Sequence, residues 1–488
     1  MINDIKGHCR PHYSLLSEEQ INQIHLTSLD ILANIGVQIS HEEALNLLER
    51  NGCAIEDNNV ARIPSSLVED CIRSVPSQVT IFNRNGKEVM NLGGENIYFG
   101  LGTDLLRTID LETDKLRLSL LRDVKNAAII SDYCQEIDFI ASFALPSDVP
   151  KNLMYIYCFK EMLENSVKPI FFTAAGKEDL EHIIEMAEIV AGGEANLKSK
   201  PFLIHYSEPT APISHSYGAI NKLFLCAERE IPICYTPADL LGGTAPVTLA
   251  GGIVQANAEA LSGIVLHQLK SPGAPIVSGF GVAPLDMRSV VICYGAPELR
   301  LTNSAFADMF HHYQIPMWST VGSDSHCLDQ QAALEHAFAI LLASMDGANL
   351  IHDIGYLGQG LVGNPASIVM CDEIISFVKR FIRGFNIDKE MVATDVIRDI
   401  GPGGNFLTHK HTLDHFREEL WRPKYLNRDG PESWISKGGK SYGDRIKTHT
   451  LKVLQTHKVE PLRDEIQKVL NLKLVEAEEK LRDISFKA

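Results

Sequence analysis

The chain has 488 residues, which is enough for one large domain with appendages or for two to three domains of ordinary size. Hydrophobic residues make up 45% and charged residues 22% of the chain, and these proportions are typical of a globular protein. The formal net charge of −17 argues against a polyanion such as DNA or RNA as a partner, because like charges repel.

Residues 1–95 have the pattern of a small helical subdomain. The stretch "SEEQINQIHLTSLDILANIG" (17–36) places apolar residues at helical spacing, begins with a Ser cap ahead of two glutamates, and stops at Gly36. The stretch "SHEEALNLLERNG" (40–52) repeats this design from Ser40 to Gly52. We therefore expect a helical N-terminal subdomain over residues 1–95.

From residue 96 onward, short β-rich runs alternate with helical patterns. Strands are predicted at 97–102, 137–144, 169–175, 201–207, 231–237, 274–281, 315–322 and 349–356. Helices are predicted at 121–133, 151–166, 177–191, 215–229, 248–270, 297–313, 328–346 and 366–384.

This alternation predicts a parallel sheet whose strands are joined by right-handed crossovers. A parallel sheet is buried on both faces, which explains why the strand candidates are nearly continuous apolar runs. Eight such units match a closed barrel; an open doubly wound sheet is the alternative, but no G-x-G-x-x-G follows the first strand. We predict an α/β protein built on a (β/α)8 TIM barrel over residues 96–385, with a mostly helical C-terminal extension over residues 386–488.

Aromatic side chains recur where the predicted strands end. Barrels of this kind carry their functional sites on the loops after the strands. Aromatic faces with nearby carboxylates can form a cage for a quaternary ammonium group, whereas the alternative is that the rings only pack the barrel interior. The aromatic residues concerned are Tyr98, Phe99, Phe143, Tyr206, Tyr235, Phe280 and Tyr356.

Histidines leave a metal site open as an alternative. His205, His326 and His352 come from three strand ends, like the ligands of barrel hydrolases, but the first strand lacks the H-x-H that such enzymes usually show. Beyond the barrel, His411 and His415 have the i, i+4 spacing that suits zinc, without an H-E-x-x-H pattern. A metal-dependent hydrolase is therefore the weaker hypothesis.

The loop after the seventh predicted strand, "GSDSHCLDQ" (322–330), concentrates polar side chains. Its Ser, Asp and His residues are sequence neighbours, whereas nucleophilic triads converge from separate elements. Cys327 is a possible nucleophile, although buried packing is commoner for a lone cysteine. The residues alone do not favour a nucleophilic triad here.

Several long stretches carry a resemblance to a known family. They read "GGTAPVTLAGGIVQANAEALSGIVLHQLKSPGAP" (242–275), "YGAPE" (294–298), "GSDSHCLDQQAALE" (322–335), "GANLIHDIGYL" (347–357) and "GPGGNFLTHKHTLDHFREELWRP" (401–423). With the N-terminal "SHEEALNLLERNGCAI", they resemble the trimethylamine methyltransferase family of corrinoid-dependent methyltransferases. The resemblance implies a barrel that moves a methyl group from a methylamine to the Co(I) of a separate corrinoid protein.

One departure from the family pattern bears on the substrate. Members that use trimethylamine carry pyrrolysine in the loop that matches residues 323–328, whereas this chain has only standard residues there, with His326 at the aligned position. Members without pyrrolysine act on quaternary amines, among them glycine betaine, proline betaine and carnitine. The resemblance therefore implies a quaternary amine as substrate, with glycine betaine first among them.

The candidate site residues are assigned by their positions at strand ends. We interpret the 322–330 loop as shaping the substrate pocket, a purely structural loop being the alternative, and take Asp324 and His326 as its catalytic candidates. Aromatic residues of the site are expected to face the ammonium group, and His352 or a backbone N–H to hold a substrate carboxylate. The predicted substrate-binding residues are Tyr98, Phe99, Tyr206, Glu208, His352, Tyr356 and Gln359.

Cofactor, partner and location follow from signatures that the chain lacks. No corrinoid-binding D-x-H-x-x-G is present, so cob(I)alamin is expected on a separate corrinoid protein, and no bound metal or nucleotide is expected. The resemblance also implies a homo-oligomer. Ten scattered cysteines without a C-x-x-C pair, a polar start of the chain and the lack of a bilayer-length apolar stretch predict a cytoplasmic protein without membrane contact. A non-catalytic betaine-binding protein remains a third alternative.

Overall fold

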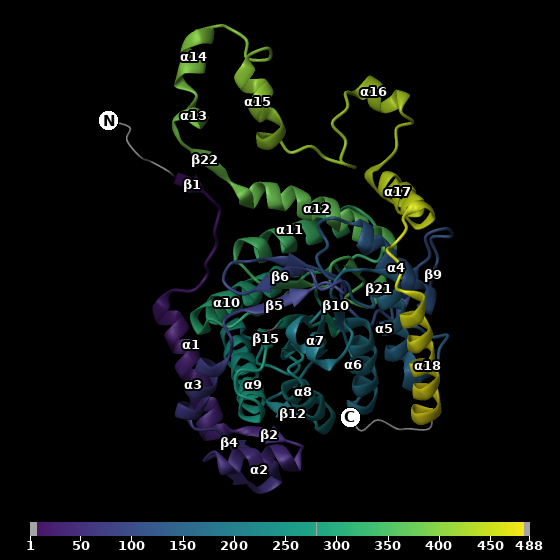
Figure 1. Cartoon of the computed structure of the whole chain (residues 1–488). Helices are drawn as coiled ribbons and strands as arrows, with labels where there is room; N and C mark the ends of the chain where they lie inside the picture. The colour runs from purple at the N-terminus through teal and green to yellow at the C-terminus, as the bar shows by residue number, and fades with distance from the viewer. Residues whose placement is uncertain (1–6, 280, 483–488) are drawn as a thin grey trace.

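Eight parallel strand segments form a closed barrel. The computed structural model describes residues 7–279 and 281–482 (Figure 1). Seven strands lie in one parallel sheet in the order β10-β11-β13-β15-β18-β19-β7. Parallel bridges from Gly100 to Phe139 and from Ile140 to Ile170 insert an eighth segment between β7 and β10, which closes the ring. The strands are β7 (Tyr98–Phe99), β10 (Ile170–Phe172), β11 (Leu203–Ser207), β13 (Ile233–Tyr235), β15 (Ile276–Gly279), β18 (Met317–Thr320) and β19 (Leu350–His352).

Each barrel segment is followed by a helix, which confirms the predicted (β/α)8 barrel. The helices are α4 (Leu121–Tyr133), α5 (Met154–Asn165), α6 (Lys177–Ala191), α8 (Tyr217–Arg229), α9 (Leu249–Lys270), α10 (Pro297–Tyr313), α11 (Gln330–Met345) and α12 (Pro365–Arg383). Helices α10 and α12 begin with proline at the first position, where its missing N–H leaves no hydrogen bond unmade. Within the described residues, α9 alone reaches the length and apolarity of a membrane span, and most of that helix is buried in the protein.

The N-terminal region contains strands as well as the expected helices. Helix α1 (Glu18–Asp30) begins at Ser17 with a capping box to Gln20, and α2 (Glu42–Arg50) is capped by His41 rather than by Ser40. Together with α3 (Ser65–Ser74) these helices flank a small sheet, β12-β2-β4-β3, and a hairpin, β5-β6. The strands are β2 (Val37–Ile39), β3 (Ala54–Glu56), β4 (Val60–Arg62), β5 (Val79–Phe82), β6 (Glu88–Leu92) and β12 (Ser214–His215).

The N-terminal region packs on the barrel through α9. Helices α1 and α3 lie against α9, and a buried polar network fixes their position. Asn257 of α9 donates from Nδ2 to Ser28 Oγ at 2.9 Å and to Tyr313 Oη at 3.0 Å. His25 Nδ1 lies 3.0 Å from the same tyrosine oxygen. Because buried polar atoms are costly when unpaired, this network holds α1 in one register on the barrel.

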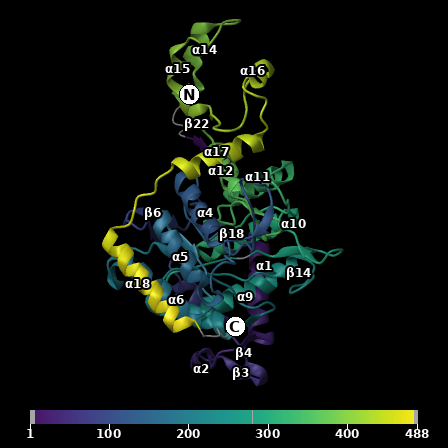
Figure 2. The same ribbon diagram turned by 90° about the vertical axis from the view of Figure 1, so that its right-hand side faces the viewer.

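The C-terminal part has a packed portion and an extended portion. Helix α17 (Tyr442–Thr456) lies against α12 and α4, and α18 (Asp464–Leu481) lies against α6. Between α12 and α17, residues 385–440 extend away from the barrel as an arm (Figures 1 and 2). At its base, β22 (Phe385–Ile387) pairs with β1 (Gly7–Cys9) in antiparallel fashion. The division of the chain at residues 95 and 385 stays a prediction.

Two small sheets stand at the carboxyl end of the barrel. The first, which we call the rim sheet, has the order β20-β21-β8-β9 and joins the loop after β19 to the loop after β7. Its strands are β8 (Arg107–Ile109), β9 (Leu116–Leu118), β20 (Tyr356–Leu357) and β21 (Val362–Gly363). The second sheet joins the loops after β13 and β15 through β14 (Leu240–Leu241), β16 (Ala283–Asp286) and β17 (Val291–Ile292).

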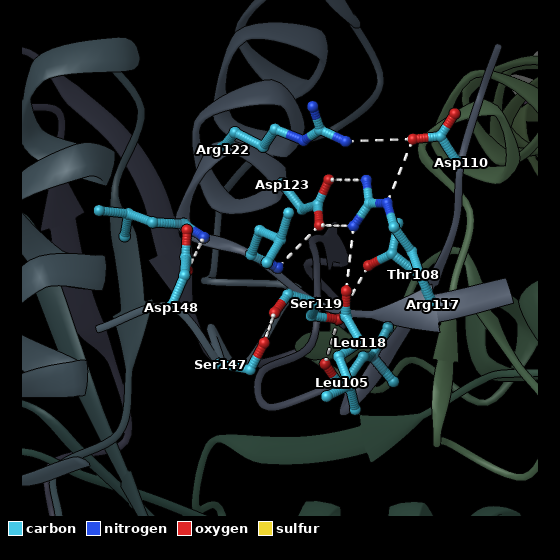
Figure 3. A network of polar contacts seen from close by, with 12 residues as sticks. Leu105, Thr108, Asp110, Arg117, Leu118, Ser119, Arg122, Asp123, Ser147 and Asp148 are labelled. Atoms are coloured by element: carbon cyan, nitrogen blue, oxygen red, sulfur yellow. Dashed lines mark hydrogen bonds and ion pairs between the residues drawn. The ribbon is translucent and has the colours of Figure 1, made fainter. Parts of the chain in front are cut away.

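One arginine connects the rim sheet to the barrel through ion pairs (Figure 3). Arg117 of β9 donates to both carboxylate oxygens of Asp123, at 2.7 and 2.8 Å, and to Asp110 at 3.1 Å. Asp123 also accepts from the backbone N–H of Leu120 at 2.9 Å and thereby caps α4. Bidentate arginine–carboxylate pairs fix geometry as well as adding stability, so the hairpin β8-β9 is held rigidly over the barrel end.

Candidate functional site

Aromatic rings from four barrel strands meet inside the barrel. Phe171 (β10), Tyr206 (β11), Trp318 (β18) and His352 (β19) contact one another with ring centroids 4.6 to 6.0 Å apart. Strands β11 and β18 are not neighbours in the sheet, so the stacked contact of Tyr206 with Trp318 crosses the interior. Tyr356, just after β19, joins them with its centroid 6.3 Å from that of His352. We call these five residues the aromatic cluster.

Strand alternation explains which rings reach this cluster. Successive side chains of a strand point to opposite faces, so Phe171 and Tyr206 point inward while Phe172 and His205 point outward. Phe172 packs 5.2 Å from Phe159 of α5, and His205 packs 5.1 Å from Phe172. The four cluster residues that belong to barrel strands thus point into the barrel, just below the loops at its carboxyl end.

Carboxylates lie beside the aromatic cluster. The Tyr206 hydroxyl donates to Glu208, which follows β11 and stays exposed. Asp353 follows β19; its Oδ2 accepts from Thr320 Oγ1 at 2.5 Å, and its Oδ1 lies 2.8 Å from His352 Nδ1. Both acids come from strand ends, as expected for a barrel site.

The protein surroundings disfavour the negative charge of two acids near the cluster, Glu208 and Asp104. Although Glu208 keeps contact with solvent, the surrounding protein partly desolvates its carboxylate and raises its pKa; the hydrogen bond from Tyr206 opposes this rise, and the Asp353 carboxylate adds to it. Burial also raises the pKa of Asp104, after β7, to about 6, with threonine hydroxyls opposing the rise. A cation bound among these carboxylates would relieve the cost of their charge. The site therefore favours a cationic ligand.

One buried ammonium group offsets part of this negative charge. Lys222 of α8 is attracted to Glu208 and Asp104, and burial lowers its pKa. Its Nζ donates to the carbonyl of Ala174 at 3.0 Å. With carboxylates at residues 104, 208 and 353, an excess of negative charge remains.

Unpaired donors lie within the aromatic cluster itself. Trp318 Nε1 and both ring nitrogens of His352 are buried and have no hydrogen-bond partner among the described residues. The close approach of His352 Nδ1 to Asp353 does not have hydrogen-bond geometry. Buried polar groups almost always find a partner, so these atoms point to a ligand or water. Since an indole N–H can only donate, the partner of Trp318 must be an acceptor.

Tyr356 is held in the cluster by a close approach that only glycine permits. Its hydroxyl donates to the carbonyl of Thr103. A Cβ on Gly102 would lie 2.2 Å from both Asp353 Oδ1 and Tyr356 Cζ. Gly102, in the segment that follows β7, is therefore required if Tyr356 and Asp353 are to keep their positions.

Hydrogen bonds from its own polar groups hold the 322–330 loop in place at the carboxyl end of the barrel. Asp324 accepts from the backbone N–H of Tyr294 at 2.7 Å and of Gly295 at 3.0 Å, while burial raises its pKa. Ser323 donates to Glu335 at 2.6 Å, and the N–H of Asp324 donates to the same oxygen at 2.8 Å. The Tyr294 ring in turn lies 6.4 Å from that of Tyr356. Asp324 thus positions a neighbour of the cluster.

Three predicted site residues lie away from the aromatic cluster. Tyr98 accepts from the backbone N–H of Asn91 at 3.0 Å, which places its hydroxyl at the hairpin β5-β6. Phe99 is buried on the outer face of the barrel, where the Lys379 ammonium lies 5.4 Å from its ring centroid. His326 is exposed and lines a separate pocket of about 410 Å³ between the rim sheet and α17.

The structure brings the other predicted substrate-binding residues to one place. Tyr206, Glu208, His352 and Tyr356 lie together, and Gln359 lies beside the 322–330 loop, where it donates to the carbonyl of Asp324 at 3.3 Å. Phe280, an aromatic candidate, lies outside the described residues.

The histidines considered for a metal site do not converge. His205 points out of the barrel, His352 points in, and His326 lies in the separate pocket. Across residues 7–279 and 281–482, no group of three or more His, Cys, Asp and Glu side chains is placed to hold a metal ion. The geometry therefore gives the hydrolase hypothesis no ligand set in the described part of the chain.

The sequence patterns did not assign Phe171, Trp318 or Asp353 to the site. Phe171 and Trp318 lie in β10 and β18, just as the predicted residues Tyr206 and His352 lie in β11 and β19, so position near a strand end does not separate the two groups. The runs "PIFFTAA" and "IPMWSTVG" are apolar on both faces, so they do not show which side chains point inward. Alternation counted back from the strand ends is the signal that could have found them.

A second pair of acids is buried outside the cluster. Gln255 Nε2 donates to Asp239 Oδ1 at 2.8 Å and to Glu259 Oε1 at 3.3 Å. The second oxygen of each acid has no partner among the described residues. Burial and the mutual repulsion of the pair raise the pKa of Asp239 to about 8, and burial raises that of Glu259 to about 7. The pair is therefore readily protonated.

Comparison with known proteins supports the architecture and the family. The chain is similar to a solved Methanosarcina barkeri monomethylamine methyltransferase (MtmB), with a TM-score of 0.52 at 11% identity, over 92% of this chain and 89% of that one. It is 31% identical to the trimethylamine methyltransferase MttB of Desulfitobacterium hafniense (strain DSM 10664 / DCB-2), over 95% of this chain and 94% of that protein. It is also 31% identical to a glycine betaine methyltransferase of Desulfitobacterium hafniense (strain Y51), over 88% of this chain and 90% of that protein.

The family model described as trimethylamine methyltransferase (MTTB) matches residues 3–479. This match spans the barrel, the arm and most of α18, so it covers every element that builds the site. The chain therefore belongs to the trimethylamine methyltransferase (MTTB) family of methyltransferases.

Proposed function

We propose that this protein transfers a methyl group from a quaternary amine, with glycine betaine as the first candidate, to the Co(I) of a separate corrinoid protein. One observation carries the proposal: the aromatic cluster adjoins carboxylates on one side and contains unpaired buried N–H donors. The aromatic faces and carboxylates suit a trimethylammonium group. Trp318 and His352 suit the carboxylate of the same small zwitterion.

The chemistry of the leaving group favours a quaternary substrate. When Co(I) takes the methyl carbon, the C–N bond breaks and its electron pair stays on nitrogen. A quaternary ammonium then leaves as a neutral tertiary amine and needs no proton. Trimethylamine would leave as an amide anion unless it were first protonated or quaternised. The 323–328 loop of this chain holds only standard residues, and the resemblance to pyrrolysine-free members of the family agrees with this argument.

The protein's own contribution is then placement. The cluster has to desolvate the ammonium group and present one methyl carbon toward the carboxyl end of the barrel. Positive charge on the substrate decreases in the transition state as the C–N bond lengthens, so carboxylates that held the cation too strongly would slow the transfer. The raised pKa of Glu208 and its bond from Tyr206 keep that charge moderate.

The partner in this proposal is a corrinoid protein that docks at the carboxyl end of the barrel and leaves with the methyl group. Other betaines, such as proline betaine and carnitine, are the alternative substrates. A cytoplasmic location stays a prediction.

A substrate panel tests the proposal. The purified protein is mixed with cob(I)alamin and with glycine betaine, proline betaine, carnitine, choline or trimethylamine, and methylcobalamin is followed by absorbance. We expect glycine betaine or another betaine to react and trimethylamine to be inert. Turnover of trimethylamine at a comparable rate would contradict the substrate argument, and no methylcobalamin with any betaine would contradict the reaction.

A further inference from the structure

Tyr294 lies at the carboxyl end of the barrel, next to the aromatic cluster. It follows β17 in the connection from β15 to α10 and begins the stretch "YGAPE". The centroid of its ring lies 6.4 Å from that of Tyr356. Tyr356 is buried, whereas Tyr294 is half-buried. Tyr294 therefore stands between the cluster and solvent.

Two glycines leave room for the ring of Tyr294. A Cβ on Gly322 would lie 2.7 Å from Tyr294 Cδ1, and a Cβ on Gly360 would lie 3.1 Å from Tyr294 Cζ. Gly360 also has a φ of 75°, a conformation that favours glycine. Gly322 lies in the loop after β18, and Gly360 lies between β20 and β21, in the connection that follows β19. The loops after two barrel strands thus converge on this ring.

The Asp324 carboxylate holds the backbone that carries the ring. Its Oδ1 accepts from the N–H of Tyr294 at 2.7 Å, and its Oδ2 accepts from the N–H of Gly295 at 3.0 Å. Arg300 Nη2 in turn donates to the carbonyl of Tyr294 at 3.4 Å. Hydrogen bonds to a charged acceptor are stronger than those between neutral groups. Since both oxygens of Asp324 are used here, Asp324 influences the site through the position of Tyr294.

The carboxylates of the site also act on Tyr294. Burial raises the pKa of the Tyr294 hydroxyl, and the negative charges of Asp353 and Glu208 raise it further, while the Arg300 guanidinium opposes the rise. The hydroxyl therefore stays protonated, and the ring stays neutral. A neutral aromatic face attracts a cation through its quadrupole. The ring and the two carboxylates thus favour the same kind of ligand, a group with a positive charge.

We infer that Tyr294 is a sixth ring of the site, whose face contacts the quaternary ammonium group of the substrate, and that Asp324 is the positioning residue that holds this ring in place. The inference rests on the proposed function and adds a residue that selects for the positive charge. It gives the 322–330 loop a role that needs no catalytic side chain, because the loop places a ring that belongs to another loop. It also explains the two glycines, since a larger residue at either position would displace the ring.

A pair of ligands isolates the contribution of the positive charge. Glycine betaine and tert-butylacetate have the same shape and the same carboxylate, but the second carries a carbon atom in place of the ammonium nitrogen. Isothermal titration into the full chain measures the affinity for each ligand. The ratio of the two affinities, glycine betaine over tert-butylacetate, reports the attraction of the site for the cation. A desolvated aromatic face contributes a factor of about five to thirty to this ratio.

Two substitutions of Tyr294 separate the aromatic face from the hydroxyl. Tyr294→Leu removes the face and should lower the ratio by about fivefold to thirtyfold, whereas Tyr294→Phe keeps the face and should leave the ratio close to that of the wild type. The matched control Tyr133→Leu removes a ring that packs on His449 and His457, away from the site, and should leave the ratio unchanged. An equal loss in Tyr294→Leu and Tyr294→Phe would overturn the assignment of the ring face.

Asp324→Ala tests the positioning role. The substitution should lower the ratio in the wild-type background and have no further effect in a Tyr294→Leu background, because Asp324 acts through the ring. A purely structural role would lower the melting temperature and leave the ratio unchanged. An unchanged ratio, or an equal loss in both backgrounds, would overturn the positioning assignment.

The wild type separates this inference from the proposed function. A wild type that does not prefer glycine betaine to tert-butylacetate would contradict the proposed ammonium site and the inference together. A wild type that shows this preference and keeps it in Tyr294→Leu would overturn the role of Tyr294 alone and leave the proposed function standing.

Discussion

Replacing Trp318 by Phe should separate recognition of the substrate's carboxylate from recognition of its ammonium group. The substitution removes an indole N–H that is buried and unpaired inside the aromatic cluster, while an aromatic face remains. Glycine betaine carries a carboxylate that can accept from this N–H. Tetramethylammonium carries the same cationic head without any acceptor.

The structure sets the size of the expected effect. A hydrogen bond to a charged partner contributes about 1.5–3 kcal/mol, which corresponds to a factor of about 10 to 150 in affinity. The smaller ring of the Trp318→Phe variant weakens the stacking on Tyr206 equally for both ligands. The ratio of the two affinities therefore reports the N–H alone.

Isothermal titration of both ligands into wild type and variant measures this ratio. We expect Trp318→Phe to weaken glycine betaine by at least about tenfold more than tetramethylammonium. Thermal unfolding of the variant checks that the barrel is intact. An equal loss for both ligands would refute the assignment of Trp318 to the carboxylate, and unchanged binding of both would remove Trp318 from the site.

Two further substitutions test the supports of the site and of the core. Gly102→Ala places a Cβ 2.2 Å from Tyr356, so it should lower kcat/KM more than tenfold and the free energy of unfolding by about 1–3 kcal/mol. The control Gly430→Ala, whose added Cβ is unhindered, should change neither quantity. Equal behaviour of the two variants would refute the close-approach argument. Burial raises the pKa of Asp239 to about 8 and that of Glu259 to about 7. Near pH 5 both carboxyls are largely protonated in the folded protein. As the pH rises toward 8, their ionisation lowers the free energy of unfolding. Asp239→Asn should therefore raise the melting temperature near pH 8 and change it little near pH 5, and a shift of the same size at both would contradict the assignment.

The barrel could be predicted because its elements are long and strongly patterned. Helix α4 and helix α10 begin and end where the sequence indicates, at 121–133 and 297–313. The N-terminal strands were not anticipated, because β2, β3 and β4 have only three residues each, which is too short for their alternation to be recognised in the sequence. Strand β12 completes their sheet from more than 150 residues away, and a local pattern does not reveal such pairing.

The site could be predicted only in part, for a geometric reason. Tyr206 and His352 could be predicted from their positions near strand ends, but Phe171 and Trp318 lie equally near the ends of β10 and β18 and were missed. Tyr98 and Phe99 were placed in the site by the same rule, yet these two residues form β7 itself, and the chain runs on past Gly100 to Gly102 before it reaches Tyr356 and Asp353. Register between strands decides which residue reaches the rim, and it depends on neighbours that are distant in sequence.

A crystal structure with glycine betaine bound tests the central claim most directly. The account predicts the trimethylammonium group against the faces of Tyr206 and Tyr356 on the Glu208 side, with the carboxylate within hydrogen-bond distance of Trp318 Nε1 or His352. Betaine bound in the reverse orientation, or in the pocket beside His326 with the aromatic cluster empty, would contradict it.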